Sequence, residues 1–195
     1  DTSDFDLLII LGGRMGAYEE DDYPWMIGEK AFIKRAIAEN KYVLGLCLGA
    51  QILADVLGGL VHPHVYNEVG WWPVHFSPQI EGTLLQGLPE MVHLFEFHGD
   101  TFTLPAGAKI LASSAGCENQ AFIYNDRVLA VQFHPEVSVE KMKVLAEAVG
   151  NVEGPYSQPV AHYMNEQAYF EQSKEVMFTI LCNFKEQIKL AEVML

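Results

Sequence analysis

The residues best suited to covalent chemistry lie in the segment 45–51, which reads Gly-Leu-Cys-Leu-Gly-Ala-Gln. A short apolar run before Cys47 predicts a strand, and the residues after it predict a helix. A strand-to-helix turn of this kind needs small neighbours, and Gly45 and Gly49 flank the cysteine. The turn would present the thiol at a helix N-terminus, where the amide dipoles favour a thiolate. We therefore interpret Cys47 as a nucleophile.

A second segment supplies the partners that a thiol nucleophile needs. Residues 128–133 are mostly apolar and predict a strand, after which the chain reads His134-Pro135-Glu136. A cysteine nucleophile requires a histidine to carry the proton and a third group to orient the imidazole. Because His134 and Glu136 are two residues apart, their side chains would share a face of an extended chain. A lone histidine at a strand end is more often structural, but this pairing favours a catalytic role.

The other cysteines and histidines give weaker signals. Cys182 lies in an apolar helical pattern and Cys117 in a predicted loop, and we interpret both as small structural hydrophobes. The segment His62-Pro63-His64 lacks the ligand spacing of a zinc site, and its proline breaks a helical register. The sequence therefore predicts neither a metal nor a cofactor.

Four segments together resemble a known family. Residues 45–51 and the run Gln-Phe-His-Pro-Glu at 132–136 resemble the class I glutamine amidotransferases of the Cys-His-Glu type. Phe-His-Gly-Asp at 97–100 looks like a segment of the amidotransferase domain of GMP synthetase, and Leu-Gly-Gly at 11–13 is similar to the family's oxyanion loop. The motifs occur in the family's order. The whole chain is most similar to free-standing amidotransferase-like proteins, whose C-terminal helical segment resembles residues 155–190.

The resemblance implies a role for each matching residue. Cys47 would attack the side-chain amide of glutamine and form a γ-glutamyl thioester. His134 would act as general base and acid, and Glu136 would orient it. An amide is a poor electrophile, so two backbone amides would have to stabilise the oxyanion. The residues implied for the oxyanion hole are Gly13 and Leu48, and those implied for glutamine binding are Gln51, Gly99 and Asp100.

Two neighbouring positions complete the implied site. His98 would shape a binding loop and would not be the catalytic histidine. Arg14 stands where the family commonly has proline, and its cation would either meet the substrate carboxylate or point to solvent. The oxyanion loop is therefore the part of the site in which this chain departs from the family's pattern.

Three functions are compatible with these residues. The first is a glutamine amidotransferase or glutaminase that releases ammonia to a separate synthetase or acceptor protein. The second is a hydrolase of another γ-glutamyl peptide or amide, which would use the same thioester chemistry. The third is a non-catalytic binding protein of the same fold, which the intact set of Cys47, His134 and Glu136 disfavours. We therefore expect a cysteine-dependent enzyme that hydrolyses a C–N amide bond.

Strands that alternate with helices predict an α/β fold with a mainly parallel central sheet and helices on both faces. The segment around Asn125-Asp126 predicts an antiparallel hairpin added to this sheet. We expect residues 1–195 to form a single domain, and the resemblance implies a flavodoxin-like architecture. It also implies a strand and a helix upstream of Phe5, which the printed sequence does not contain. Ligands of such sheets bind at the carboxyl ends of strands, where Gly13, Cys47 and Glu136 are predicted to lie.

Composition excludes several classes of partner. Hydrophobic residues make up 50% of the chain and charged residues only 19%, which is typical of a packed enzyme. A net charge of −14 argues against nucleic acid and against anionic membranes. No apolar run approaches the roughly 20 residues that span a bilayer. The chain has three cysteines, an odd number that suits a reducing compartment, so we expect a cytoplasmic protein.

Overall fold

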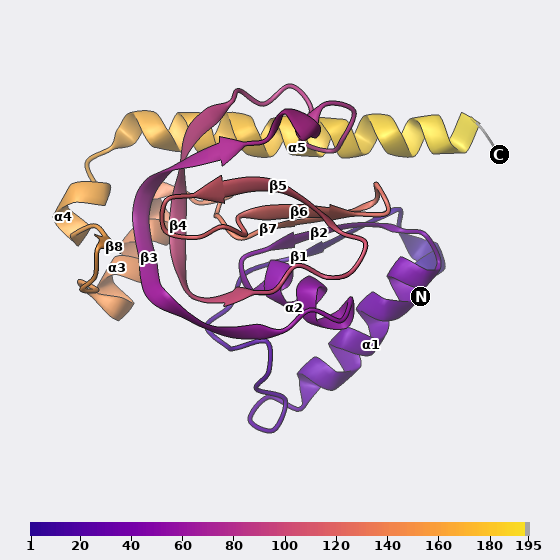
Figure 1. Cartoon of the computed structure of the whole chain (residues 1–195), viewed down its shortest axis with the longest axis horizontal. Coiled ribbons are helices and arrows are strands. Elements are labelled where there is room, and N and C mark those ends of the chain that lie inside the picture. The colour runs from indigo at the N-terminus through magenta and orange to yellow at the C-terminus, as the bar shows by residue number, and fades with distance from the viewer. Residues whose placement is uncertain (194–195) are drawn as a thin grey trace.

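Strands that are apolar on both faces form the centre of the sheet. β2 (Tyr42–Leu46) and β7 (Val128–Val131) are buried at every position. β1 (Leu7–Ile10) pairs with β2, and β2 pairs with β7, both in parallel. Continuous apolar runs suit such strands because helices cover both faces of a parallel sheet. The computed structural model describes residues 1–193; in it β1 forms one edge of the sheet, and β2 and β7 lie inside it (Figure 1).

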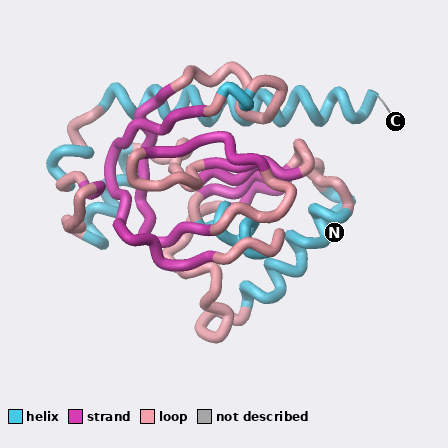
Figure 2. The backbone as a smooth tube through the Cα atoms, viewed as in Figure 1, coloured by secondary structure: helices cyan, strands magenta, loops and turns pink. Residues whose placement is uncertain are grey.

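Antiparallel strands extend the sheet beyond β7, in the order β1-β2-β7-β6-β5-β3-β4. Their bounds are β3 (Val61–Phe76), β4 (Met91–Phe102), β5 (Lys109–Ser114) and β6 (Ala121–Tyr124). The short β8 (Tyr156–Ser157) pairs in parallel with β3. β3 and β4 form a long curved ribbon that wraps around one end of the other strands (Figures 1 and 2). β4 is consequently an edge strand, and its outer edge is available to the rest of the molecule.

Helices cover the two faces of the sheet. On one face lie α1 (Trp25–Ala38) and α2 (Leu48–Val56), and α5 (Gln167–Val193) runs across the other (Figure 1). The shorter α3 (Val139–Val149) and α4 (Val160–Tyr163) lie near the β3–β4 ribbon, and two 3₁₀ turns span Thr2–Asp4 and Pro78–Ile80. Among residues 1–193 no helix is long and apolar enough to cross a bilayer.

The side chains of β2 alternate between two apolar cores. Leu44 and Leu46 pack in the core that includes Phe184 of α5. Val43 packs in the opposite core, with Ile33 of α1. Each of these side chains is at most 1% exposed, and full burial of one such side chain contributes about 1.5–3 kcal/mol. This two-sided burial fixes the position of β2, and therefore of the residue that follows it.

The predicted α/β class is confirmed, and several element bounds differ from those predicted. The sequence pattern predicts two strands, over 60–65 and 69–76, but the structure has the single strand β3, whose pairing with β4 shifts register between Pro63 and Glu68. The sequence pattern predicts a strand over 91–97, but this strand continues to Phe102, so the segment 97–100, which is expected to form a binding loop, is strand. The sequence pattern predicts the helix after Cys47 over 51–57, whereas the structure begins it at Leu48.

Two further predictions concern the hairpin and the spare cysteines. Asn125 and Asp126 have φ values of 50° and 54°, which is the conformation that a tight type I′ hairpin turn requires, so the predicted hairpin is confirmed. The interpretation of Cys182 as a buried hydrophobe is wrong, because its side chain is exposed on α5. Cys117 is buried.

Candidate active site

Cys47 occupies a strained turn between β2 and α2. Its φ of 51° and ψ of −108° lie outside the conformations that most residues adopt. Glycines make the turn sterically feasible: a Cβ atom on Gly45 would lie 2.5 Å from the carbonyl oxygen of Gly49, and one on Gly49 would collide with the carbonyl oxygen of Ile10. The helix therefore passes close to β1 and β2, and the thiol is held at the N-terminus of α2.

His134 lies between Cys47 and Glu136. Its Nδ1 is 2.9 Å from Oε1 of Glu136, and the Cys47 thiol lies close enough to raise the pKa of its imidazole. Its backbone N–H donates to the carbonyl oxygen of Phe95 at 2.8 Å, which ties the segment after β7 to the edge of β4. The three predicted residues therefore meet in space, although Cys47 and His134 are 87 positions apart in the sequence.

The electrostatics of this group favour a charged imidazole. Burial alone would lower the pKa of His134, but Cys47 and Glu136 outweigh burial and hold this pKa well above its ordinary value. Burial would likewise raise the pKa of Glu136, yet the hydrogen bond and charge of His134 keep it below its ordinary value. The pair is therefore an imidazolium against a carboxylate. Such a histidine already carries a proton that it can donate to a leaving group as a general acid.

The glycine loop after β1 borders this group. A Cβ atom on Gly12 would lie 3.1 Å from Cε1 of His134 and 3.4 Å from Cβ of Cys47. A Cβ atom on Gly13 would lie 2.8 Å from the side chain of Leu48. Leu48 is the first residue of α2, so its backbone N–H has no acceptor within the helix. The two residues predicted for the oxyanion hole are therefore neighbours beside the thiol, and Gly12 is an adjacent residue that the sequence analysis did not single out.

The edge of β4 forms the wall of the site opposite this loop. Sγ of Cys47 lies 4.0 Å from the carbonyl oxygen of Phe97. Nε2 of Gln51 donates to the carbonyl oxygen of Asp100 at 3.3 Å and to Oε1 of Gln132 at 3.1 Å. Gln51 is only 4% exposed, so its amide group holds α2 against β4. Its contact with a bound glutamine stays a prediction.

The remaining predicted residues lie on the same stretch of β4. Gly99 faces the side chain of Asn67, whose Oδ1 would be 2.6 Å from a Cβ atom at this position. Burial and the nearby carboxylate of Asp100 raise the pKa of Tyr18. The loop after β1 thus reaches across to the end of β4. Arg14, in the same loop, is exposed.

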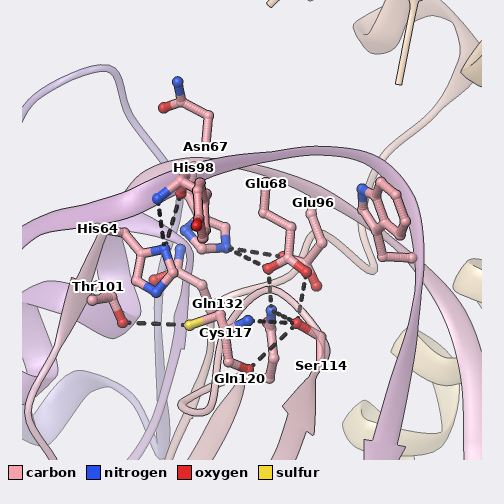
Figure 3. A network of polar contacts seen from close by, with 12 residues as sticks. His64, Asn67, Glu68, Glu96, His98, Thr101, Ser114, Cys117, Gln120 and Gln132 are labelled. Carbon is pink, nitrogen blue, oxygen red and sulfur yellow. Dashed lines mark hydrogen bonds and ion pairs between the residues drawn. The ribbon is translucent and has the colours of Figure 1, made fainter. Parts of the chain in front are cut away.

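A buried polar cluster that the sequence did not predict lies next to the site. Glu68 of β3 and His98 of β4 are cross-strand partners, and Glu96 lies two residues before His98 (Figure 3). Nε2 of His98 is 3.2 Å from Oε2 of Glu68 and 3.4 Å from Oε2 of Glu96. The alternation of Glu96 and His98 within an apolar strand was a usable signal. Their partner Glu68 could not be inferred, because the register of β3 shifts just before it.

The chain matches a family model and several known proteins. The family model described as "Glutamine amidotransferase class-I" matches residues 1–149. A glutamine-hydrolyzing GMP synthase subunit of Sulfolobus acidocaldarius is 35% identical over 139 residues, which are 70% of each chain. The glutamine amidotransferase-like protein YfeJ of Salmonella typhimurium is 28% identical over 150 residues, 75% of this chain and 63% of that protein.

Solved structures give a similar result. A glutamine amidotransferase from Thermotoga maritima is 30% identical with a TM-score of 0.75, and the match covers 95% of this chain and 79% of that one. A glutamine amido transferase from Methylobacillus flagellatus is 26% identical with a TM-score of 0.87, and the match covers 95% and 78% of the two chains. The range matched by the family model, residues 1–149, includes the segments that carry Cys47 and His134.

Proposed function

Because the chain belongs to the class I glutamine amidotransferase family, we propose that it hydrolyses the side-chain amide of glutamine through a γ-glutamyl thioester on Cys47. The observation that carries this proposal is the convergence of Cys47, His134 and Glu136 at the carboxyl ends of β2 and β7. A nucleophile, a proton carrier and an orienting carboxylate are the groups that amide cleavage through a covalent intermediate requires.

The first half of the reaction forms the thioester. Sγ of Cys47, as the thiolate, attacks the amide carbon, and the carbonyl oxygen becomes an oxyanion. The backbone amides of Gly13 and Leu48 donate to that oxygen, and each such donor is worth roughly a hundred- to a thousandfold in rate. His134 then gives its proton to the departing nitrogen, the C–N bond breaks and ammonia leaves.

The second half regenerates the thiol. The now neutral His134 takes a proton from a water molecule, whose oxygen attacks the thioester carbon. The C–S bond breaks, glutamate leaves, and the thiolate and imidazolium are restored. Glu136 keeps the imidazole oriented through both halves, because its 2.9 Å hydrogen bond fixes the ring from Nδ1 and leaves Nε2 for the reacting atoms. Glutamine and water are thereby converted into glutamate and ammonia.

The ammonia is proposed to pass to a separate partner. The Sulfolobus relative is named as one subunit of a glutamine-hydrolyzing GMP synthase, which supports a division of labour between two chains. The chain spans 63% of the length of the Salmonella relative, so the identity of an acceptor does not follow from that likeness. We propose a cytoplasmic enzyme whose acceptor is bound by another protein chain.

Replacement of Cys47 tests this function directly. We expect Cys47→Ala to abolish ammonia release from glutamine and to leave the thermal midpoint within a few degrees of the parent, because the thiol is a nucleophile and not a core anchor. Ammonia release should be measured on glutamine and on a panel of γ-glutamyl peptides and amides. Turnover of the conjugates but not of glutamine would replace the glutaminase with a γ-glutamyl hydrolase.

A labelling experiment separates an enzyme from a non-catalytic binding protein. An electrophilic glutamine analogue should alkylate Cys47 and spare the exposed Cys182, which peptide mapping by mass spectrometry would detect. Absence of the Cys47 adduct, under conditions that label a known amidotransferase, would contradict the proposal in all its enzymatic forms.

A further inference from the structure

The buried polar cluster behind β4 has no role in the chemistry described above (Figure 3). The side chains of Glu68, Glu96 and His98 are at most 1% exposed. Lys and Arg side chains are absent from their hydrogen bonds and ion pairs within residues 1–193. Two carboxyl groups buried without a permanent cation are costly unless protons or a metal ion neutralise them.

Hydrogen-bond chemistry determines where protons lie in this cluster. Nδ1 of His98 is 2.9 Å from the carbonyl oxygen of Asp100, and a carbonyl can only accept, so Nδ1 carries a hydrogen. Nε2 faces carboxylate oxygens of Glu68 and Glu96, which also only accept when ionised. When Nε2 faces an ionised carboxylate, it carries a second hydrogen, and the imidazole is then positively charged.

The two carboxyl groups differ in their surroundings. Oε1 of Glu68 accepts from the hydroxyl of Ser114 at 2.6 Å, and Oε2 accepts from Nε2 of Gln120 at 2.7 Å. Neither oxygen of Glu96 has a hydrogen-bond partner among residues 1–193. Hydrogen bonds stabilise the ionised form of a carboxyl group, and burial without them favours the neutral form. The negative charge is thus best placed on Glu68, and the remaining proton on Glu96.

This cluster is attached to the wall of the candidate site. His98 binds the carbonyl oxygen of Asp100, which is the same oxygen that Gln51 holds from the side of α2. The carbonyl of the preceding Phe97 faces the thiol of Cys47. The segment from Phe97 to Asp100 is consequently held from both sides, by α2 on the site's side and by the cluster from behind.

We propose that His98 is a positioning residue, held as an imidazolium between an ionised Glu68 and a protonated Glu96, and that this unit fixes the β4 segment that borders the substrate. Burial would lower the pKa of His98, but Glu68 and Glu96 outweigh it and hold the pKa well above its ordinary value. Burial raises the pKa of Glu96 to about 7, and the neighbouring charges of His98 and His134 oppose that rise. The effect on turnover rests on the proposed glutaminase function, whereas the protonation of His98 does not.

A metal ion is the competing occupant of the cluster. One ligand atom from each of the three side chains lies within 4.8 Å of the other two, and both carboxylate and imidazole bind divalent cations. We favour the protons because the oxygens of Glu68 are already occupied by Ser114 and Gln120. If a metal ion occupies the cluster, loss of the Glu68 carboxylate and loss of the Glu96 carboxylate should impair the protein equally. If protons occupy it, the two losses should have different effects.

The first experiment observes His98 in the unmodified protein. Imidazole nitrogen NMR should show both nitrogens of His98 protonated from pH 6 to at least about pH 8, with metal content measured on the same sample. Titration of His98 near its ordinary pKa of about 6.5, or a stoichiometric metal that replaces its Nε2 proton, would overturn the proposal. This readout is independent of activity, so it decides the inference even if the protein releases no ammonia.

The second experiment compares matched substitutions. We expect Glu68→Gln to raise KM for glutamine by about tenfold or more, with a smaller change in kcat, because the counter-ion of His98 is lost. Glu96→Gln should raise KM less and leave His98 protonated, because an amide replaces a neutral carboxyl group of the same shape. Glu90→Gln, an exposed change just before β4, is the control.

A milder variant covers the case in which Glu68→Gln does not fold. Ser114→Ala removes one donor to Glu68 and should raise KM in the same direction with a smaller effect. Equal effects of Glu68→Gln and Glu96→Gln on KM, or an effect on kcat alone, would contradict a positioning role for the unit.

Discussion

At the scale of single residues, one imidazole is held between two groups that both favour its charged form. Cys47 and Glu136 lie against His134, and together they overcome the effect of burial on its pKa. Because Glu136 bonds Nδ1, the other nitrogen can face the thiol and the substrate. The carboxylate therefore both orients the ring and helps to keep it protonated.

Substitutions at this pair should separate proton transfer from orientation. We expect His134→Ala to reduce kcat by about a thousandfold or more, and Glu136→Gln to reduce it less, because an orienting group is more dispensable than the proton carrier. Glu136→Gln should also lower the pKa of His134, since a stabilising negative charge is removed. The alkaline limb of kcat/KM should then move to lower pH. An unchanged limb, or a larger loss for Glu136→Gln, would show that the pair is misassigned.

The three residues that we propose as catalytic, and that the fold brings together, could be singled out because their signals are local. Cys47 is marked by flanking glycines on a strand-turn-helix pattern, and His134 and Glu136 are two residues apart at a strand end. The Glu68–His98 contact could not be predicted in this way. It joins residues 30 positions apart across an antiparallel pair whose register shifts, and only the folded ribbon brings them together.

At the scale of elements, the site depends on how closely α2 approaches the sheet. Gly45 and Gly49 are packed against backbone atoms, so even a methyl group would push the helix away from β1 and β2. Gly28, in the exposed face of α1, has no atom within 4 Å of a Cβ atom built on it. Gly49 in α2 therefore has no room for a methyl group, whereas Gly28 in α1 does.

We expect Gly49→Ala to lower the free energy of unfolding by about 1–3 kcal/mol or more and to impair turnover, because overpacking displaces the turn that carries Cys47. Gly28→Ala should instead raise the free energy of unfolding by about 0.5–1 kcal/mol and retain turnover, since alanine is the better helix former. Urea unfolding and ammonia release measure the two effects. A neutral Gly49→Ala would mean that the close approach of α2 is not required.

Element types were easier to predict than element bounds. The buried parallel strands β2 and β7 are short and almost entirely apolar, so their length and their polar or turn-forming neighbours identify them. The sequence pattern predicts two strands in place of β3 because Pro63 and the polar residues after it interrupt the apolar pattern. In the structure, pairing with β4 continues past this interruption. Tertiary pairing, and not local propensity, determines the length of that strand.

At the scale of the whole molecule, titration of buried groups connects the fold to pH. The folded protein holds the pKa of Glu96 at about 7, whereas an unfolded carboxyl group has its ordinary value near 4.5. The folded state therefore binds this proton more tightly than the unfolded state does. The resulting stabilisation is complete below about pH 4.5 and is lost as the pH rises through about 7.

We expect the free energy of unfolding to fall between about pH 5 and pH 8, with a contribution from Glu96 on the order of 3 kcal/mol. Glu96→Gln should flatten that part of the profile, because its side chain cannot titrate. Glu90→Gln should follow the parent, since its side chain is exposed. Urea unfolding at several pH values measures all three proteins. If the free energy of unfolding depended on pH in the same way in the parent and in Glu96→Gln, titration of Glu96 would not contribute to stability.

The strand β4 presents alternate residues to two different environments. Phe95 and Phe97 pack with Trp71 in an aromatic cluster, whereas Glu96 and His98 enter the polar cluster on the other side. Insertion or deletion of one residue here would exchange the two sets, placing carboxyl groups among aromatic rings and rings among carboxyl groups. Family members that share both clusters should accordingly vary in length before Met91 or after Phe102, and natural selection should remove any single-codon gap between them.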